Sequence, residues 1–171
     1  VLWLLDEHAE LKKNLRQQAA SFGVDPDRLV FASRVPRAQY LGYFDHADLF
    51  LDSPIFNAHT TASDALRRGV PVVTLPGTSF QARVGASLCR SIGLTETVVD
   101  SFDAYRDIAI RLGHSHSELG RLQAMLIANY TNSPLFDIRR FSGNLESLYH
   151  AMADRHRAGL GPQMLFAPEH R

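Results

Sequence analysis

The sequence predicts an α/β fold in which helices cover both faces of a parallel sheet. Short apolar runs alternate along the chain with longer segments of helical periodicity, and this alternation is typical of parallel sheets. The runs are apolar without a break, as expected of strands that are covered on both faces. Ligands of such sheets bind beyond the carboxyl ends of the strands, so a site is expected in the loops that follow the strands.

Five apolar runs are expected to form the strands: Val1–Leu5, Leu29–Ala32, Asp48–Leu51, Val70–Leu75 and Thr97–Val99. Helical spacing of apolar residues predicts seven helices: Glu7–Phe22, Arg37–Phe44, Thr60–Arg68, Phe80–Ile92, Phe102–Leu112, Ser117–Asn129 and Pro134–Arg157. The last helix is longer than closing the sheet requires, and we expect it to reach another domain. Residues 158–171 carry turn formers and no periodicity, so they are expected to be a flexible tail behind a domain of residues 1–157.

Length and charge limit the class of protein. The chain has one domain's length, and its 18 basic and 18 acidic residues balance, so neither nucleic acid nor a membrane is expected as a partner. No apolar run approaches the roughly 20 residues that span a bilayer. The single cysteine excludes an internal disulfide and fits a reducing compartment, the cytoplasm. No pair of the eight histidines has metal-ligand spacing, so no metal is expected.

The segment from Asn57 to Leu66 is the strongest indication of a binding site. It reads Asn-Ala-His-Thr-Thr-Ala-Ser-Asp-Ala-Leu and follows the third expected strand. His59, Thr60 and Thr61 therefore fall at a helix N-terminus, whose unpaired amides attract anions. Asp64, one turn further, can accept hydrogen bonds from a ribose diol while the first turn holds a diphosphate. This loop would then bind the diphosphate and the ribose of a nucleotide.

The same spacing has a purely structural explanation. A hydroxyl of Thr60, Thr61 or Ser63 could simply cap the helix, and Asp64 could improve the helix macrodipole. On local spacing alone, the two explanations are about equally good.

A second loop, Leu75-Pro76-Gly77-Thr78-Ser79-Phe80, follows the next expected strand and opens the next helix. Because neighbouring parallel strands end at the same edge of a sheet, this loop is expected beside the first. Arg83, one turn inside the helix, could face the same anion. A turn and an N-cap explain the loop as well, and an arginine on a helix is more often a solvated surface residue.

A third segment, Ala32-Ser33-Arg34-Val35-Pro36-Arg37, places two cations beside backbone that Pro36 holds extended. Main-chain groups of such a segment can pair with the edge of a base while the cations offset phosphate charge. An ordinary strand-to-helix connection is the simpler explanation unless the first loop binds a nucleotide. Of the eight histidines, only His59 falls within an expected site.

Together these segments resemble one family. The resemblance is carried by six runs: Asp48–Asp52, Asn57–Leu66, Gly69–Val72, Leu75–Gly77, Ala82–Val84 and Ser133–Asp137. They are similar to the carboxyl-terminal half of the catalytic region of the O-linked N-acetylglucosamine transferase and SPINDLY family, glycosyltransferase family 41. Bacterial members that carry tetratricopeptide repeats look most similar. The similarity runs from Val1 to about Arg157.

The resemblance implies that residues 1–157 are the Rossmann-like, C-terminal domain of a GT-B glycosyltransferase, which holds a UDP-sugar. It implies contacts of His59, Thr60 and Thr61 with the diphosphate, of Asp64 with the ribose hydroxyls, and of the segment at Val35 and Arg37 with the uracil. Gly77, Thr78 and Arg83 lie in a family motif and are carried as further donor-site residues.

The implied reaction moves a sugar, N-acetylglucosamine, from UDP to a Ser or Thr hydroxyl of an acceptor protein, with inversion and without a metal or other cofactor. Animal members have a lysine shortly after the first strand. Asp6 follows the first strand here, and Arg34 or His59 could stabilise the leaving diphosphate instead. The chain starts inside an apolar run without an initiator Met, so the N-terminal GT-B domain and the repeats are expected elsewhere in a longer polypeptide. This chain alone is expected to bind nucleotide without transferring sugar.

Two other functions remain open at this point. A nucleotide-binding or interaction module without catalysis would explain Asp6. Another GT-B enzyme, such as a nucleotide-sugar epimerase, would need acid and base groups from both domains, and only His59 stands out for such a role here.

Overall fold

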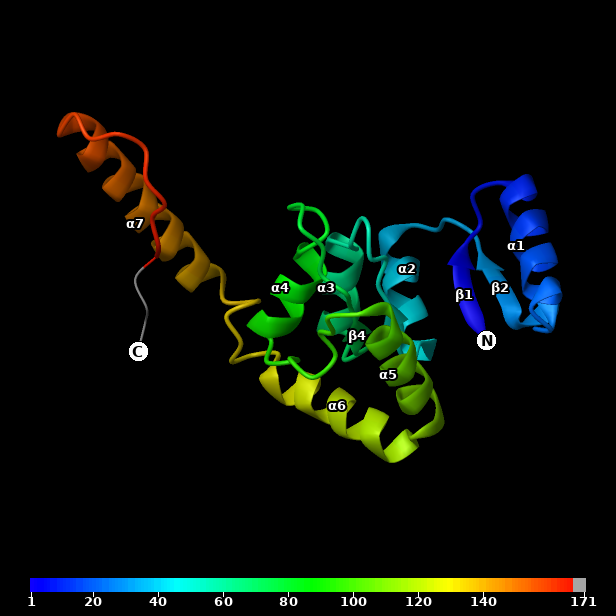
Figure 1. Cartoon of the computed structure of the whole chain (residues 1–171). Coiled ribbons are helices and arrows are strands. Elements are labelled where there is room, and N and C mark those ends of the chain that lie inside the picture. Colours follow the sequence, from blue (N-terminus) through cyan, green and yellow to red (C-terminus); the bar gives the residue numbers. More distant parts are fainter. Residues whose placement is uncertain (168–171) are drawn as a thin grey trace. The chain divides into compact units, whose positions relative to one another are not determined.

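A computed structural model describes residues 1–167, and its helices and strands follow one another in the order of an α/β fold (Figure 1). The strands are β1 (Leu2–Leu5), β2 (Leu29–Ala32), β3 (Phe50–Leu51) and β4 (Val72–Val73). The helices are α1 (Ala9–Ser21), α2 (Arg37–Tyr43), α3 (Thr60–Arg67), α4 (Val84–Ser91), α5 (Phe102–His114), α6 (His116–Asn129) and α7 (Ile138–Arg157). Two short 3-10 helices, η1 (Pro26–Arg28) and η2 (Phe44–His46), were not expected. The expected α/β class is confirmed.

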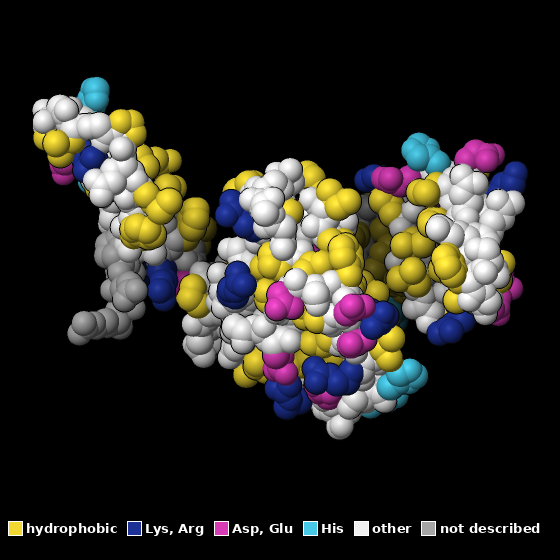
Figure 2. Space-filling view, viewed as in Figure 1, with side chains coloured by type: hydrophobic (Ala, Val, Ile, Leu, Met, Phe, Trp, Pro, Cys, Tyr) yellow, Lys and Arg dark blue, Asp and Glu magenta, His cyan; other side chains and the backbone are white. Residues whose placement is uncertain are grey.

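The chain divides into two compact units, Val1–His46 and Ala47–Arg171. In the first unit, β1 and β2 pair in parallel and α1 connects them in a β-α-β motif, which α2 and η2 follow. Hydrophobic side chains show at its surface (right in Figure 2), and Trp3 of β1 is 40% exposed. The apolar pattern predicts a strand covered on both faces, which β1 is not. A unit of this size buries little surface, and α1 has no buried residue.

In the second unit, β3 and β4 pair in parallel, so their carboxyl ends lie at one edge. The expected strand Thr97–Val99 is present only as a bridge between Val98 and Thr74. Two hydrogen bonds make this bridge: the amide of Thr74 donates to Thr97 O over 3.1 Å, and the amide of Val99 donates to Thr74 O over 3.0 Å. The backbone of residues 97–99 therefore pairs with the chain at Thr74 as a parallel strand would, but only at this one position.

The core of the second unit lies around α3. This helix packs against α4, α6 and β4. Both residues of β4 are fully buried, as its apolar pattern predicts. The largest side chains that are almost wholly buried in this unit include Leu66, Ile92, Leu94, Leu112, Leu122 and Leu126. The end of α3 is also as expected, because Gly69 takes φ +77° directly after the C-cap Arg68, a conformation that favours glycine. Helix α3 is therefore held on three sides.

Two helices begin four residues later than the sequence predicts. Helix α4 begins at Val84 and not at Phe80, because residues 79–83 form turns in which the amide of Arg83 donates to Phe80 O over 3.1 Å. Helix α7 begins at Ile138 and not at Pro134, because the carboxylate of Asp137 caps it by accepting a hydrogen bond from the amide of Arg140 over 2.9 Å.

Helix α7 has 20 residues and buries none of them. Hydrophobic side chains gather along it (Figure 2), among them Ile138, Phe141, Tyr149 and Met152. Of the expected tail, residues 160–167 form no helix or strand, and residues 168–171 lie outside the described residues. None of the described helices is both long and apolar enough to cross a membrane.

Candidate functional site

The N-terminus of α3 is open to a ligand. His59 is its N-cap, and the His59 side chain makes no capping hydrogen bond. The amide of Ser63 donates to His59 O over 3.1 Å and so makes the first hydrogen bond of the helix, which leaves the amides of residues 60–62 without an acceptor inside the helix, although Ala62 itself is fully buried. Thr60 and Thr61 are exposed. The N-cap position is therefore held by His59 and not by Thr60, Thr61 or Ser63, the three residues that the structural alternative names.

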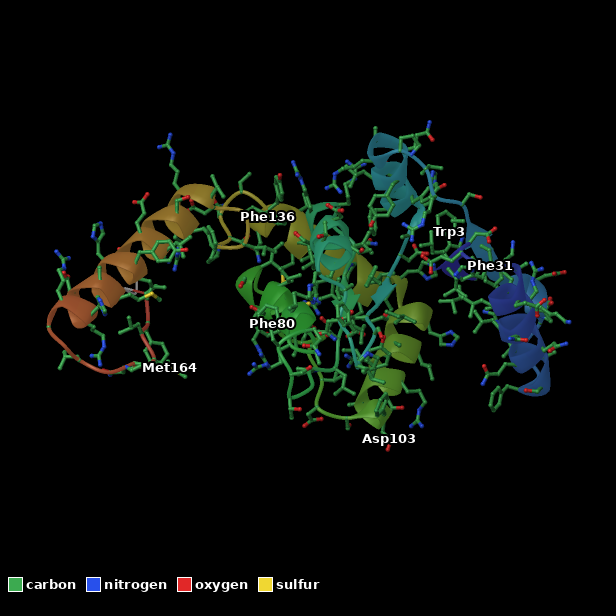
Figure 3. The ribbon with its side chains drawn as sticks, turned by 90° about the horizontal axis from the view of Figure 1, so that it is seen from above. Trp3, Phe31, Phe80, Asp103, Phe136 and Met164 are labelled. Carbon is green, nitrogen blue, oxygen red and sulfur yellow. The ribbon has the colours of Figure 1, made fainter. Side chains whose placement is uncertain are left out.

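Two exposed phenyl rings hold the imidazole of His59. The ring of Phe56 stacks on it, with centroids 5.2 Å apart and 14° between the planes, and the ring of Phe80 meets it edge-on at 6.3 Å. Phe80 lies in the loop that leads into α4 (Figure 3). His59 Nε2 is 3.5 Å from Gln81 O. Neither aromatic residue was predicted to contact His59, although Phe56 stands three positions before it.

Asp64 faces the interior more than the sequence suggests. It lies one turn into α3, but its side chain is only 5% exposed, and it already has an interaction within the protein. Little of the carboxylate is therefore open to a ribose in this conformation. Thr60 and Thr61, by contrast, need no rearrangement to meet a ligand.

The second loop lies beside the first, because the amide of Asn57 donates to Gln81 O over 3.0 Å. Gly77 is required here: its amide donates to Ala82 O over 2.7 Å, and a Cβ at Gly77 would lie 2.8 Å from the Ala82 Cβ. Thr78 is exposed. Arg83 is the N-cap of α4 and does not lie one turn inside the helix, and its Nε donates to Ser79 O over 3.2 Å. The expected position of Arg83 within the helix was wrong, because the helix begins later.

The expected base-binding segment belongs to the other unit. Pro36 is the N-cap of α2 with ψ 150°, so its backbone is extended as expected, and Val35 is half-buried. Arg37 opens α2 and is partnered within the protein. Arg34 forms an ion pair with Glu7. All of these residues belong to the unit Val1–His46.

Asp6 also has an ionic partner. Its carboxylate accepts a hydrogen bond from Lys12 Nζ over 2.8 Å, and both side chains are partly exposed. The position directly after β1 thus carries a negative charge that is paired with Lys12 of α1.

A buried carboxylate that was not predicted as a site residue closes the first loop. Asp52 directly follows β3 and is only 2% exposed. Its Oδ1 accepts a hydrogen bond from the amide of Ala58 over 2.7 Å, and its Oδ2 accepts one from Thr74 Oγ1, also over 2.7 Å. Tyr105 Oη donates to the backbone oxygen of Asp52 over 2.9 Å. The only signal in the sequence was an aspartate immediately after a strand.

Asn57 completes this closure. Its Nδ2 donates to Ser53 O over 2.7 Å, and its Oδ1 accepts a hydrogen bond from the amide of Gly85 over 3.1 Å. Gly85 lies so close to the cluster that a Cβ on it would be 2.1 Å from Asp52 Oδ2. The first loop is thereby tied to α4.

Burial governs the ionisation of these groups. It raises the pKa of the Asp52 carboxyl above its ordinary value of 3.8, although hydrogen bonds from Ala58 and Thr74 oppose the shift. Burial raises the pKa of Tyr105 to about 12, and the charge of Asp52 adds to this. Burial also raises the pKa of the Cys89 thiol to about 12, so this cysteine is no nucleophile. Among residues 1–167, no group of three or more His, Cys, Asp or Glu residues is placed to hold a metal ion.

The raised pKa of Asp52 predicts a pH dependence of stability. The folded protein keeps the Asp52 proton to a higher pH than the unfolded chain does, so the stabilisation from this group is complete below pH 3.8 and is lost as the pH rises through the folded-state pKa. We expect the free energy of unfolding of the unaltered chain, minus that of Asp52→Asn, to fall with rising pH in this window. Urea unfolding of both proteins from about pH 3 to pH 7 measures the difference. A difference that rises with pH would contradict the assignment.

The comparisons with known proteins agree on one family. A model of the family described as glycosyl transferase family 41 matches residues 1–145. A probable UDP-N-acetylglucosamine peptide N-acetylglucosaminyltransferase SEC of Arabidopsis thaliana is 37% identical over 163 residues, which are 95% of this chain and 17% of the plant protein. A UDP-N-acetylglucosamine peptide N-acetylglucosaminyltransferase of Caenorhabditis elegans is 32% identical over 94% of this chain and 14% of its own length.

A solved structure is also similar. A mutant of the O-GlcNAc transferase of Thermobaculum terrenum superimposes with a TM-score of 0.82 and 32% sequence identity. The match covers 88% of this chain and 30% of the bacterial protein. The chain thus spans less than a third of each of these three relatives.

Proposed function

Since the chain belongs to glycosyl transferase family 41, we propose that it is the donor-binding part of a protein O-glycosyltransferase, with a UDP-sugar as its ligand. The relatives are named for the transfer of N-acetylglucosamine to a peptide, which favours this sugar and a Ser or Thr acceptor. They do not favour an epimerase or a module without catalysis. The remainder of a GT-B enzyme, its N-terminal domain and the repeats, would supply the acceptor site. The cytoplasm stays our prediction for the location.

The observation that carries the proposal is the N-terminus of α3, where the His59 side chain makes no capping hydrogen bond. Its first amides have no acceptor inside the helix, and the positive end of the helix dipole lies at the exposed Thr60 and Thr61. A diphosphate there would accept hydrogen bonds from these amides and from the two hydroxyls. His59, held between the two phenyl rings, would add a donor at the same place.

In the proposed reaction, the bond between the anomeric carbon and the β-phosphate oxygen breaks, and a bond from the acceptor hydroxyl oxygen to that carbon forms with inversion. The diphosphate leaves with the electron pair, and the hydroxyl proton passes to a base outside this chain. Charge develops on the departing diphosphate, and the α3 amides would stabilise it without a metal. Asp64 would bind the ribose after its carboxylate turns outward, Val35 and Arg37 the uracil, and Gly77, Thr78 and Arg83 the rest of the donor.

A nucleotide titration tests the proposal. We expect UDP to bind the purified chain in calorimetry more tightly than GDP or ADP. We expect Thr61→Val to weaken binding by about tenfold, because a hydrogen bond to a charged group contributes about 1.5 kcal/mol or more. Thr131→Val, which alters an exposed threonine in the turn after α6, is the matched control. A folded chain that binds none of the three nucleotides would refute the proposal.

The role of the arginine after β2 can be tested in the same titration. Arg34→Ala should weaken UDP binding if this guanidinium leaves its ion pair with Glu7 to meet the diphosphate. Unchanged affinity would remove Arg34 from the donor site and leave His59 as the side chain proposed to stabilise the leaving group. With UDP-N-acetylglucosamine and an acceptor peptide, we expect no transfer by this chain alone.

A further inference from the structure

We propose that Asp52 is a positioning residue of the donor site, which fixes the first loop so that the α3 amides meet the diphosphate in one orientation. The inference rests on the proposed function. Asp52 follows β3 and Ala58 precedes the N-cap His59, so the hydrogen bond of 2.7 Å between the Asp52 carboxylate and the Ala58 amide closes the loop on itself. The backbone is thereby fixed at Ala58, two residues before Thr60, whose amide is the first that we assign to the ligand.

The second oxygen of the carboxylate ties this loop to the neighbouring strand. Thr74 follows β4 and donates its hydroxyl hydrogen to Asp52 Oδ2 over 2.7 Å. Both residues are buried, Thr74 completely. A hydrogen bond to an ionised acceptor is shorter and roughly twice as strong as a neutral one, and it is less screened inside the protein. One carboxylate thus holds the start and the end of the loop and the next strand together.

Asp52 acts through the backbone and not by touching the ligand. Its side chain is 2% exposed, and Gly85 lies against Oδ2 so closely that no Cβ fits between them. Ionisation of Asp52 opposes folding, since burial raises its pKa. The two hydrogen bonds of the carboxylate, from the Ala58 amide and from Thr74 Oγ1, therefore carry its role, and the neutral side-chain oxygen of an asparagine could replace the acceptor for Ala58.

The test compares four variants of the whole chain. Asp52→Ala removes both acceptors. Asp52→Asn keeps an acceptor for Ala58 with almost the same shape, and Thr74→Val removes only the donor to Oδ2. Asp25→Ala is the matched control, because Asp25 also accepts a hydrogen bond from a backbone amide, that of Asp27 over 3.0 Å, but in the turn before η1. UDP affinity is measured by calorimetry at neutral pH, after circular dichroism has shown that each variant is folded.

We expect Asp52→Ala to weaken UDP binding by about tenfold or more and Thr74→Val by a few-fold, although neither side chain can reach the ligand. Asp52→Asn should restore most of the affinity, and Asp25→Ala should leave it unchanged. Hydrogen exchange at the Ala58 amide, followed by NMR without nucleotide, should be slow in the unaltered chain and in Asp52→Asn. It should become faster in Asp52→Ala, or in Thr74→Val if Asp52→Ala does not fold.

The outcomes separate this inference from the proposed function. Equal UDP affinity in Asp52→Ala and the unaltered chain, or in Thr74→Val where Asp52→Ala does not fold, would overturn the role of Asp52 while the proposed function stands. An unaltered chain that binds no UDP would overturn both. A loss of stability with unchanged affinity would make Asp52 a structural residue only.

Discussion

Replacing Gly85 with alanine is expected to destabilise the unit Ala47–Arg171 by about 3 kcal/mol. The new Cβ would lie 2.1 Å from Asp52 Oδ2 and 2.7 Å from Thr74 Oγ1, far inside van der Waals contact. Both atoms belong to buried, hydrogen-bonded side chains, so neither can move aside without breaking the bond between them. The amide of Gly85 also donates to Asn57 Oδ1, which prevents the helix from shifting freely. Urea unfolding at neutral pH measures the loss.

A second glycine serves as the control for this substitution. Gly120 lies within α6, and nothing lies within 4 Å of the place where its Cβ would stand. Gly120→Ala should therefore stabilise the protein slightly, by about 0.5–1 kcal/mol, because alanine is the better helix former. A Gly85→Ala protein as stable as the unaltered chain would show that α4 can move away from Asp52. The close approach of the helix to the carboxylate would then not be needed for stability.

The elements that the sequence predicts best are those with a local signal at both ends. Helix α3 starts at the expected Thr60 and stops before Gly69, a glycine with positive φ. Helix α4 was expected four residues early, because Phe80 continues the apolar spacing although its segment is held in turns by hydrogen bonds within the loop. The strand at Thr97–Val99 was expected from composition. Whether such a run pairs along its whole length depends on a partner segment elsewhere in the chain, and the composition of the run does not specify that partner.

The residues of the site also differ in how far local sequence predicts them. The helix N-terminus with His59, Thr60 and Thr61 follows from the order of elements, so sequence reasoning could place it. The hydrogen bond between Asp52 and Thr74 joins residues 22 positions apart, and local spacing carries no trace of it. The burial of Asp64 likewise could not be predicted from local sequence, because the helices that pack against α3 come from later in the chain.

Replacing Leu66 with alanine is expected to reduce the free energy of unfolding by about 3 kcal/mol, the usual cost of a cavity left by a buried leucine. Leu66 is 1% exposed and lies in α3, which has only eight residues. A helix of that length is not stable by itself in water, so its place depends on packing against α4, α6 and β4. Thermal and urea unfolding measure the loss. Ile127→Ala, at a site that is 68% exposed, should cost much less.

The Leu66→Ala protein also tests whether UDP still binds when the packing of α3 is weakened. If nucleotide binds at the N-terminus of α3, UDP should stabilise the folded Leu66→Ala protein as it does the unaltered chain, by an amount that grows with the logarithm of its concentration above Kd. Thermal unfolding at several UDP concentrations measures this. A decrease of less than about 1 kcal/mol in the free energy of unfolding of Leu66→Ala would contradict the predicted cavity cost. It would mean that the loops, and not the buried face of α3, hold the helix in place.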